Sequence, residues 1–486
     1  MTGLAFRSAT ALAAALRTRE IGCRELLEHY LERVERHNPA LNAIIVTDFR
    51  GARRRADEAD AALARGESWG PLHGLPMTVK ESFDVVGLPT TWGLTDLKNN
   101  IPSANALAVG RLLAAGAVIF GKTNVPVLLA DSQSYNPVYG TTNNPWDLAL
   151  TPGGSSGGAA AALAAGLTGL EIGSDIGGSI RNPAHYCGVW GHKPTYGIAP
   201  PRGQSLPGNV AASDISVIGP LARSAEDLAL ALDIIAGPDP IEAAGWRLDL
   251  APPRGTALSD YRIAVMLDDP NCAVDREVQD ILQGVADFLA RQGAEVSDRA
   301  RPDIDTAELH AVYIKLLRAA TSRRLTQEVF ERHVETARGL DPADQSYVAR
   351  MMRGVTLSHR DWLADNEERH RLRLKWAEFF RDYDLLLCPV TAGAAYPHDH
   401  DHEGERWKRM IQINGKPAPT INDLFWAGLT GLVYLPATVA PAGLTAKGLP
   451  VGAQIVGPQY GDKSCIAFAG LLERAYRAFV APPGFG

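Results

Sequence analysis

Residues 151–195 read TPGGSSGGAAAALAAGLTGLEIGSDIGGSIRNPAHYCGVWGHKPT, and this stretch decides the fold. Two of its serines stand beside glycines, Ser155 within GGSSGG and Ser179 within DIGGSIR. Glycine neighbours leave a serine hydroxyl uncovered and let backbone N–H groups point at one place. A nucleophile beside an oxyanion hole needs this arrangement. The small apolar segment between the two motifs predicts a tightly packed helix.

Composition bounds the class of protein. The chain has 486 residues, of which 46% are hydrophobic and 21% charged, enough for a large globular core. Its net charge of −7 argues against nucleic acid as a partner. No apolar run reaches the length of a membrane span, and the N-terminal ATALAAAL continues into a helical pattern rather than a cleaved signal. The five scattered cysteines predict buried free thiols, so we expect a cytoplasmic protein without a disulfide framework or zinc site.

Helical and strand patterns alternate along the chain. Residues 8–37 predict two helices broken near Ile21, with Pro39 ending the second. MTVK predicts a short strand that ends on Lys80, and residues 303–380 read as helical. Two strands and a helix from Lys463 to Phe479 are expected to complete the sheet at the C-terminus. This alternation predicts an α/β fold with helices on both faces of the sheet.

Two other motifs compete with the serine pair. Gly116–Thr123 satisfies the phosphate-loop pattern, which needs a strand before it and a helix after it. Here a helical pattern precedes it and Pro126 blocks a following helix, so we expect Lys122 to hold core loops instead. Residues 153–157 satisfy the nucleophile-elbow pattern, but Pro152 interrupts the strand that must precede an elbow, and no later His-Asp arrangement is indicated.

The motifs together resemble the amidase signature family of serine hydrolases. They are GLPMTVK at 74–80, GGSSGG, DIGGSIR and GHKPTYG at 191–197, and the resemblance runs from about residue 10 to the C-terminus. It implies a single α/β domain spanning residues 1–486, with a large central mixed β-sheet covered by helices on both faces. The catalytic core is expected at about 60–235, and a variable helical region that lines the substrate site at about 303–425.

The resemblance also implies a Ser–Ser–Lys relay. Lys80 would act as a neutral base, Ser155 would bridge within a turn that contains a cis peptide bond, and Ser179 would attack the carbonyl. Because a lysine has an ordinary pKa of about 10.4, burial must lower the pKa of Lys80, and apolar walls are expected to supply that burial. Arg181 is a candidate for a second cation that assists.

The same resemblance assigns the supporting groups. Ser156 is expected to tune the hydrogen bonds around Lys80, and Asp175 to orient the loop. The oxyanion hole would consist of the backbone N–H groups of Ile176, Gly177, Gly178 and Ser179. No cofactor or metal is implied. The tract HDHDHE at 398–403 carries metal-ligating side chains, but a solvated loop is the favoured interpretation.

Two departures from the family pattern bear on the substrate. Val127 and Leu128 follow Pro126 where a glutamate is common, and Ile198 replaces an arginine. Both changes favour an uncharged, partly aromatic substrate. We therefore expect a serine amidohydrolase that cleaves small or aryl linear amides through an acyl-enzyme, with esters or carbamates (urethanes) as further substrates.

Two alternatives stay open beside this interpretation. The first is the glutamine-amidase subunit of a tRNA-dependent amidotransferase, which should carry polar residues for the glutamine head group between 303 and 425. The second is a binding protein that keeps the fold, which the presence of Lys80, Ser155 and Ser179 disfavours. A small-molecule partner is expected, with no nucleic acid and no membrane, and the sequence leaves open whether the chain forms a homodimer.

Overall fold

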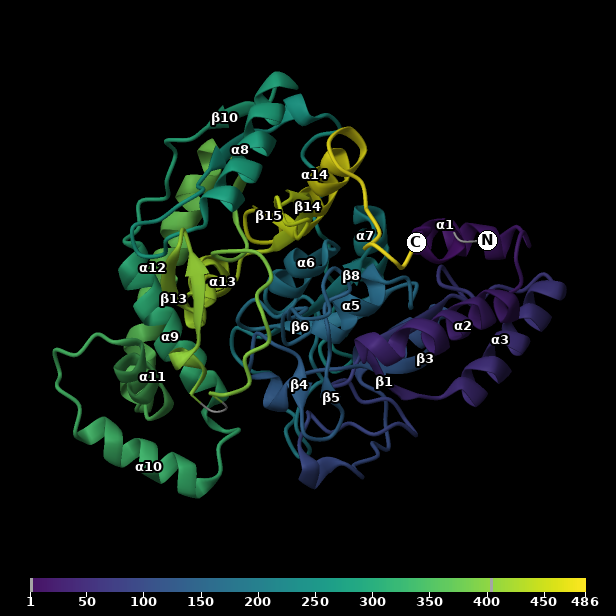
Figure 1. Cartoon of the computed structure of the whole chain (residues 1–486), viewed down its shortest axis with the longest axis horizontal. Coiled ribbons are helices and arrows are strands. Elements are labelled where there is room, and N and C mark those ends of the chain that lie inside the picture. The colour runs from purple at the N-terminus through teal and green to yellow at the C-terminus, as the bar shows by residue number, and fades with distance from the viewer. Residues whose placement is uncertain (1–2, 403–404) are drawn as a thin grey trace.

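The computed structural model describes residues 3–402 and 405–486 and is dominated by one mixed eight-stranded sheet (Figure 1). The strand order is β10-β9-β11-β15-β14-β7-β8-β6. Strand β9 is parallel to β10 and β11, and every other neighbouring pair is antiparallel. In chain order the strands are β6 (Glu171–Asp175), β7 (Trp190–Lys193), β8 (Val217–Ala222), β9 (Arg262–Val265), β10 (Glu295–Ser297), β11 (Leu385–Pro389), β14 (Ala437–Leu444) and β15 (Pro450–Val456).

A three-stranded sheet carries the lysine strand. Its order is β1-β3-β2, with bounds β1 (Ile44–Thr47), β3 (Val118–Thr123) and β2 (Pro76–Lys80). Strand β2 packs beside β6 of the main sheet, so the last residue of β2 lies near the end of β6. Two short hairpins, β4 (Tyr135–Asn136) with β5 (Gly140–Thr141) and β12 (Met410–Ile413) with β13 (Lys416–Pro419), complete the described strands.

Helices cover both faces of the main sheet. Helix α6 packs against β7, β14 and β15, and α7, α8 and α14 pack against strands of the same sheet. The described helices are α1 (Ala9–Arg17), α2 (Cys23–Leu41), α3 (Phe49–Ala64), α4 (Leu107–Ala114), α5 (Gly157–Ala164), α6 (Arg181–Cys187), α7 (Ala225–Ile235), α8 (Arg276–Arg291), α9 (Thr306–Ser322), α10 (Gln327–Arg338), α11 (Tyr347–Val355), α12 (His359–Asp382), α13 (Asp423–Gly431) and α14 (Asp462–Ala475).

The tight helix expected between the two serine motifs is present as α5. All eight of its residues are buried. A Cβ at Gly158 would lie 2.3 Å from the backbone nitrogen of Asn124, so only glycine permits this approach to the turn after β3. Small side chains therefore let α5 contact both sheets, which places Ser155 and Ser156 at its N-terminal end between β2 and β6.

Most of the expected elements are confirmed, with one clear error. As expected, α1 ends at Arg17 and α2 begins at Cys23. Strands β14 and β15 complete the main sheet, and α14 packs against it. Pro39, however, does not end α2, which continues to Leu41. Pro39 removes the one bond that an N–H at this position would donate to the carbonyl of Glu35, but only two helical residues follow it. Asn42 then ends the helix in a left-handed conformation, with a bond from its N–H to the carbonyl of Asn38 at 2.6 Å.

The phosphate-loop pattern is folded as a strand. Gly121, Lys122 and Thr123 lie inside β3, and Lys122 donates hydrogen bonds from Nζ to the carbonyl oxygen of Pro89 at 2.5 Å and the hydroxyl of Thr90 at 2.9 Å. The expectation that Lys122 holds core loops is therefore confirmed. The N–H groups of this segment serve the sheet and are not available as a phosphate cradle.

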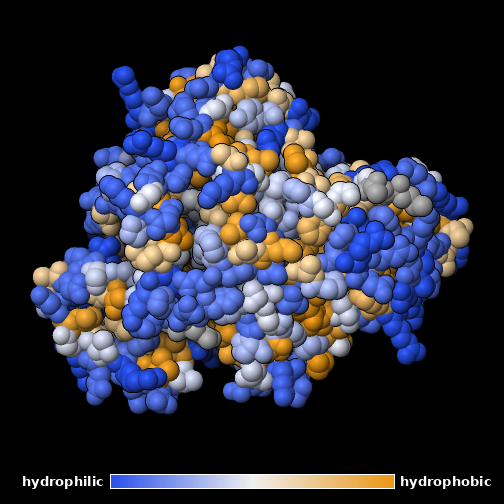
Figure 2. Space-filling model, viewed as in Figure 1, coloured by the Kyte–Doolittle hydropathy of each residue, from blue (hydrophilic) through white to orange (hydrophobic). Residues whose placement is uncertain are grey.

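Near the two ends of the chain, the rings of Phe6 and Phe479 stack with centroids 5.9 Å apart. Helices α10 and α11 lie at the edge of the molecule (Figure 1). Hydrophilic residues cover most of the face shown in Figure 2, where hydrophobic residues gather only in small groups. All five cysteines are buried and free. No helix in the described ranges combines the length and the apolar character needed to span a bilayer.

Candidate active site

Lys80 lies in the interior at the end of β2, surrounded by serines. Its side chain is fully buried, and Nζ lies 2.6 Å from Oγ of Ser155, 2.9 Å from Oγ of Ser156 and 3.1 Å from Oγ of Ser174. The carbonyl oxygen of Ser174 lies 3.4 Å away. The apolar walls expected around the amine are thus replaced, next to Nζ itself, by a cage of hydroxyl groups. The expected cis peptide bond is confirmed between Gly154 and Ser155.

Burial lowers the pKa of Lys80 well below its ordinary value. The negative charges of Asp175 and Glu171 oppose this shift, and the positive charge of Arg324 adds to it. Arg181, the cation that the sequence offered for this effect, instead pairs with Asp175 at 2.9 Å. The structure therefore contains an amine poised to be neutral, which is the state in which a lysine can accept a proton.

The loop that carries Ser179 is organised by the carboxylate of Asp175. That carboxylate accepts hydrogen bonds from the N–H of Gly178 at 2.9 Å and of Ile180 at 3.1 Å, and from Arg181 Nε at 3.0 Å and Nη2 at 2.9 Å. Burial alone would raise the pKa of Asp175, but the charge and hydrogen bonds of Arg181 outweigh it and hold that pKa well below its usual range. Asp175 is therefore a fixed anion.

Of the four N–H groups expected in the oxyanion hole, this geometry engages one and, among the described residues, leaves three free. Because Gly178 donates its N–H to Asp175, that group is already engaged. Within the described part of the chain, the N–H groups of Ile176, Gly177 and Ser179 have no hydrogen-bond acceptor. Gly178 contributes its backbone conformation instead, with φ of +93°, and a Cβ there would lie 3.3 Å from the methyl group of Ala427.

Sequence reasoning missed three residues that support the site. Ser174 completes the cage around Lys80, and the side-chain amide of Gln204 donates to Oγ of Ser174 at 3.2 Å. Tyr313, on α9, donates its hydroxyl to the carbonyl oxygen of Ile176 at 2.9 Å and so fixes the peptide next to the free N–H groups. Ser174 precedes Asp175 on a buried strand, which is a signal in the sequence, whereas Gln204 and Tyr313 carry none.

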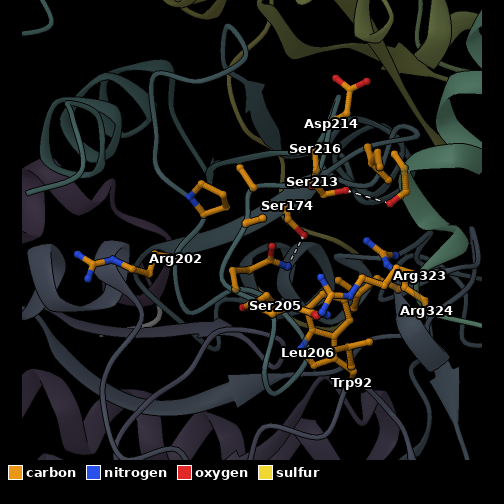
Figure 3. A pocket seen from close by; sticks show the side chains of 18 of the residues that line it. Trp92, Ser174, Arg202, Ser205, Leu206, Ser213, Asp214, Ser216, Arg323 and Arg324 are labelled. Carbon is orange, nitrogen blue, oxygen red and sulfur yellow. Dashed lines mark hydrogen bonds between the residues drawn. The ribbon is translucent and has the colours of Figure 1, made fainter. Parts of the chain in front are cut away.

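Two cavities meet at Ser179. The first, of about 300 Å³, is lined by Ser155, Ser174 and Ser179 on one side and by Trp92, Leu206 and Arg324 on another, as Figure 3 shows for the labelled residues. The second, of about 150 Å³, borders Gly154, Gly177 and Ser179 and is also lined by residues of α9, α13 and the 128–132 loop. A group at Ser179 can therefore extend in two directions, as the two halves of a linear amide require.

Comparison with known proteins identifies the family. The family model described as Amidase matches residues 25–466. The chain belongs to the amidase family. This membership makes the protein an amidase, a hydrolase of carbon–nitrogen bonds with the mixed α/β fold described above. Solved structures agree, since a bacterial aryl acylamidase of the amidase signature family superposes with a TM-score of 0.82 at 26% identity over 99% of both chains.

Relatives within the family carry the names of different enzymes. The chain is 34% identical to a glutamyl-tRNA(Gln) amidotransferase subunit of Anaeromyxobacter sp. (strain K), over 97% of this chain and 96% of that protein. It is 32% identical to an indoleacetamide hydrolase of Bradyrhizobium diazoefficiens, over 96% of this chain and 86% of that protein. The family is therefore settled, whereas the names of these relatives do not agree on one substrate.

The described residues of the histidine-rich tract line neither of the two cavities at Ser179. Among the described residues, no group of three or more His, Cys, Asp or Glu side chains is arranged to hold a metal ion. His400 stacks on the ring of Tyr135 at 3.8 Å between centroids, and the backbone N–H of Asp399 donates to the side chain of Gln133 at 3.0 Å. Glu403, the last residue of the tract, lies outside the described residues.

Proposed function

We propose that the protein is a serine amidohydrolase that cleaves small or aryl linear amides through an acyl-enzyme on Ser179. The observation that carries the proposal is the buried contact of 2.6 Å between Lys80 Nζ and Ser155 Oγ beside the cavity that Ser179 lines. A neutral amine has one lone pair, so it can accept the hydroxyl proton of Ser155. Ser155 can in turn accept the proton of Ser179 as the latter attacks.

The proposed reaction conserves every proton. Oγ of Ser179 bonds to the carbonyl carbon, and its proton moves through Ser155 to Lys80. The N–H groups of Ile176, Gly177 and Ser179 stabilise the negative oxygen, each such donor contributing about 3 kcal/mol. The carbon–nitrogen bond then breaks, and the proton returns through Ser155 to the leaving amine. Water hydrolyses the acyl-enzyme by the same relay, regenerating Ser179 and giving a carboxylic acid, which releases its proton to solvent at neutral pH.

The relay requires the hydroxyl groups of Ser155 and Ser179 to rotate into hydrogen-bonding contact. No hydrogen bond joins the hydroxyls of Ser155 and Ser179 among the described contacts, although both side chains line the first cavity. The backbone N–H of Ser156 donates to the carbonyl oxygen of Ser179 at 3.1 Å, which holds the two turns together. Serine hydroxyls rotate, and catalytic hydrogen bonds often form only when substrate is bound. The lack of a hydrogen bond between Ser155 and Ser179 without substrate is therefore compatible with the relay.

The test is covalent and kinetic. A fluorophosphonate probe should label Ser179, identified by peptide mass spectrometry, and Ser179→Ala should remove the label. The purified chain alone should release 4-nitroaniline from simple 4-nitroanilides. Esters and aryl carbamates belong in the same screen, since only the leaving group or the acyl heteroatom changes. A chain that binds no probe and cleaves no anilide, ester or carbamate would not be such a hydrolase.

A second candidate function is supported by Asp423. This carboxyl, on α13, is 7% exposed, lines the second cavity and leaves Oδ1 without a side-chain or backbone donor among the described hydrogen bonds. Such a group fits the ammonium of an amino-acid amide, as the glutamine-amidase subunit of a tRNA-dependent amidotransferase would require. Several relatives are named as subunits of glutamyl-tRNA(Gln) amidotransferases. Release of glutamate from glutamine by the chain, with no release of 4-nitroaniline from anilides, would favour this candidate.

A further inference from the structure

Two arginines without a carboxylate partner line the second cavity. Arg318 lies on α9, and Arg324 follows the end of that helix. Across residues 3–402 and 405–486, neither guanidinium forms an ion pair. Burying a charge without a counter-charge is costly, and proteins pair nearly all such groups. Two unpaired cations beside one cavity therefore indicate that something else supplies the negative charge.

The contacts that these arginines do make leave donors free. Arg318 donates from Nη2 to the hydroxyl of Tyr347, but its Nε is buried and has no acceptor in the described part of the chain. Arg324 donates from Nη1 to the carbonyl oxygen of Leu128 at 3.0 Å and lies over the ring of Trp92. Neutral acceptors fix the position of both groups without neutralising either of them.

The two cations also act on each other. Burial, together with the smaller effect of the charge of Arg318, lowers the pKa of Arg324 to about 10. Burial likewise lowers the pKa of Arg318, and Arg406, which borders the same cavity, contributes in the same direction. The repulsion between these like charges costs free energy, and other contacts hold both side chains in place. Arginines clustered in this way typically bind an anion.

The acidic groups in this cavity do not cancel the arginines. Asp131 is held by the buried Arg409, whose Nη1 lies 2.6 Å from Oδ2. Asp423 is buried, and that burial raises its pKa to about 7, so the carboxyl carries only part of a charge at neutral pH. The second cavity therefore has a net positive charge, in a chain whose overall charge is −7.

We propose that Arg318 and Arg324 form a carboxylate subsite, so that the preferred amides carry a carboxylate remote from the scissile bond. This inference rests on the proposed amidase function and names its substrate class. A planar carboxylate offers two acceptor oxygens, which match the two guanidinium groups that border this cavity. Arg324 lines both cavities, so the carboxylate lies within the space that one half of the substrate occupies. A substrate with a remote carboxylate replaces the uncharged substrate that Val127, Leu128 and Ile198 favoured.

The experiment compares charged and neutral isosteres. N-(4-nitrophenyl)succinamate is paired with 4-methylpentanoyl 4-nitroanilide, in which an isopropyl group replaces the carboxylate. The malonyl and glutaryl homologues vary the reach. A second pair, 4-acetamidobenzoate against 4-isopropylacetanilide, places the carboxylate on the amine side. We expect kcat/KM to favour the charged member of at least one pair by tenfold or more, about the value of a charge-assisted hydrogen bond.

Variants test whether Arg318 causes the preference for the charged substrate. Arg318→Gln should reduce the charged-to-neutral ratio by about tenfold, the loss of one charge-assisted bond. Arg332→Gln, the same charge change on the exposed surface of α10, should leave the ratio unchanged. Equal rates within every pair, or a ratio that Arg318→Gln does not alter, would overturn the subsite. We use Arg318 because the charge of Arg324 also acts on Lys80.

Direct binding separates this inference from the proposed function. Ser179→Ala should bind N-(4-nitrophenyl)succinamate more tightly than its neutral isostere by calorimetry, and Ser179→Ala combined with Arg318→Gln should lose the difference. If no amide is cleaved but this difference in binding is present, the subsite stands and the proposed function fails. If anilides are cleaved and the difference is absent for both acyl-side and amine-side carboxylates, the function stands and the subsite fails.

Discussion

Nζ of Lys80 lies 2.6 Å from Oγ of Ser155 in the protein interior. In Lys80→Met the amine is lost while the side-chain volume is kept, so no group remains to take the proton of Ser155. General-base catalysis contributes about 10²–10⁴ in rate, and we expect kcat for anilides to fall by at least that factor. The rate of fluorophosphonate labelling should fall in parallel.

Matched variants decide whether that loss is chemical. Lys375→Met removes an exposed lysine from α12 and should leave kcat unchanged. Thermal unfolding should show that Lys80→Met keeps a cooperative transition. If Lys80→Met folds and retains wild-type kcat, Lys80 is not the base.

The second prediction concerns pH. Because Lys80 must be neutral, activity should fall as pH decreases through its pKa, which burial sets well below the ordinary lysine value. The positive charge of Arg324 contributes to that lowering. Arg324→Gln should therefore raise the pKa of Lys80 and move the acid limb of kcat/KM to higher pH. The profile is to be measured with a neutral anilide, so that loss of the proposed carboxylate subsite does not contribute. A limb that stays in place, or moves to lower pH, would contradict the coupling.

The motifs proposed to be catalytic could be read from the sequence because each is local. Lys80, Ser155 and Ser179 sit in short glycine-rich or strand patterns whose geometry follows from neighbouring residues. Local logic could also have shown that Asp175 engages the N–H of Gly178, since aspartates commonly accept from an N–H three residues later. The resemblance to the family placed Gly178 in the oxyanion hole and hid that signal.

The two cavities proposed to hold substrate could not be predicted in the same way. Arg318 comes from a helical region rich in arginine, where most such side chains face water, and nothing in its neighbours distinguishes it. Only the packing of α9 against α11 and α13 brings it to the cavity beside Ser179. Asp423 likewise precedes an ordinary apolar run, and its burial beside Tyr186 is a tertiary property. Long-range packing therefore decides what the local motifs act upon.

The third prediction concerns the buried ion pair of Asp175 and Arg181. Both side chains are at most 1% exposed. Asp175→Asn leaves Arg181 charged in the interior and weakens the acceptors of Gly178 and Ile180, so we expect a loss of about 3–5 kcal/mol in the free energy of unfolding. Urea denaturation measures it. Glu378→Gln, which breaks an exposed pair with Arg381, should cost less than about 1 kcal/mol.

A double variant tests the cause of that loss. Arg181→Met removes the stranded charge, so Asp175→Asn combined with Arg181→Met should be less destabilised than the sum of the two single variants. Strict additivity would mean that the two side chains contribute independently.

The fourth prediction concerns Tyr313, a positioning residue. Its hydroxyl fixes the carbonyl oxygen of Ile176 at 2.9 Å, next to the N–H groups proposed for the oxyanion hole. Tyr313→Phe removes one neutral hydrogen bond, so kcat should fall by about threefold to tenfold with KM nearly unchanged. Tyr261→Phe removes a comparable bond to the carbonyl of Gly255, away from both cavities, and should leave kcat unchanged. A change confined to KM would assign Tyr313 to substrate binding instead.

The last prediction uses Asp423 to separate the two candidate functions. Burial raises its pKa to about 7, so the carboxyl is neutral below that pH and charged above it. Above pH 7 the charged form should attract an ammonium group in the second cavity. KM for an amino-acid anilide should therefore fall as pH rises through 7, relative to KM for the matching anilide without the amino group, and Asp423→Asn should abolish this relative change. The comparison must stay below the pKa of the substrate's own amine. If the relative KM is flat in the wild type, Asp423 does not recognise the ammonium, and the glutamine-amidase candidate loses the observation that favours it.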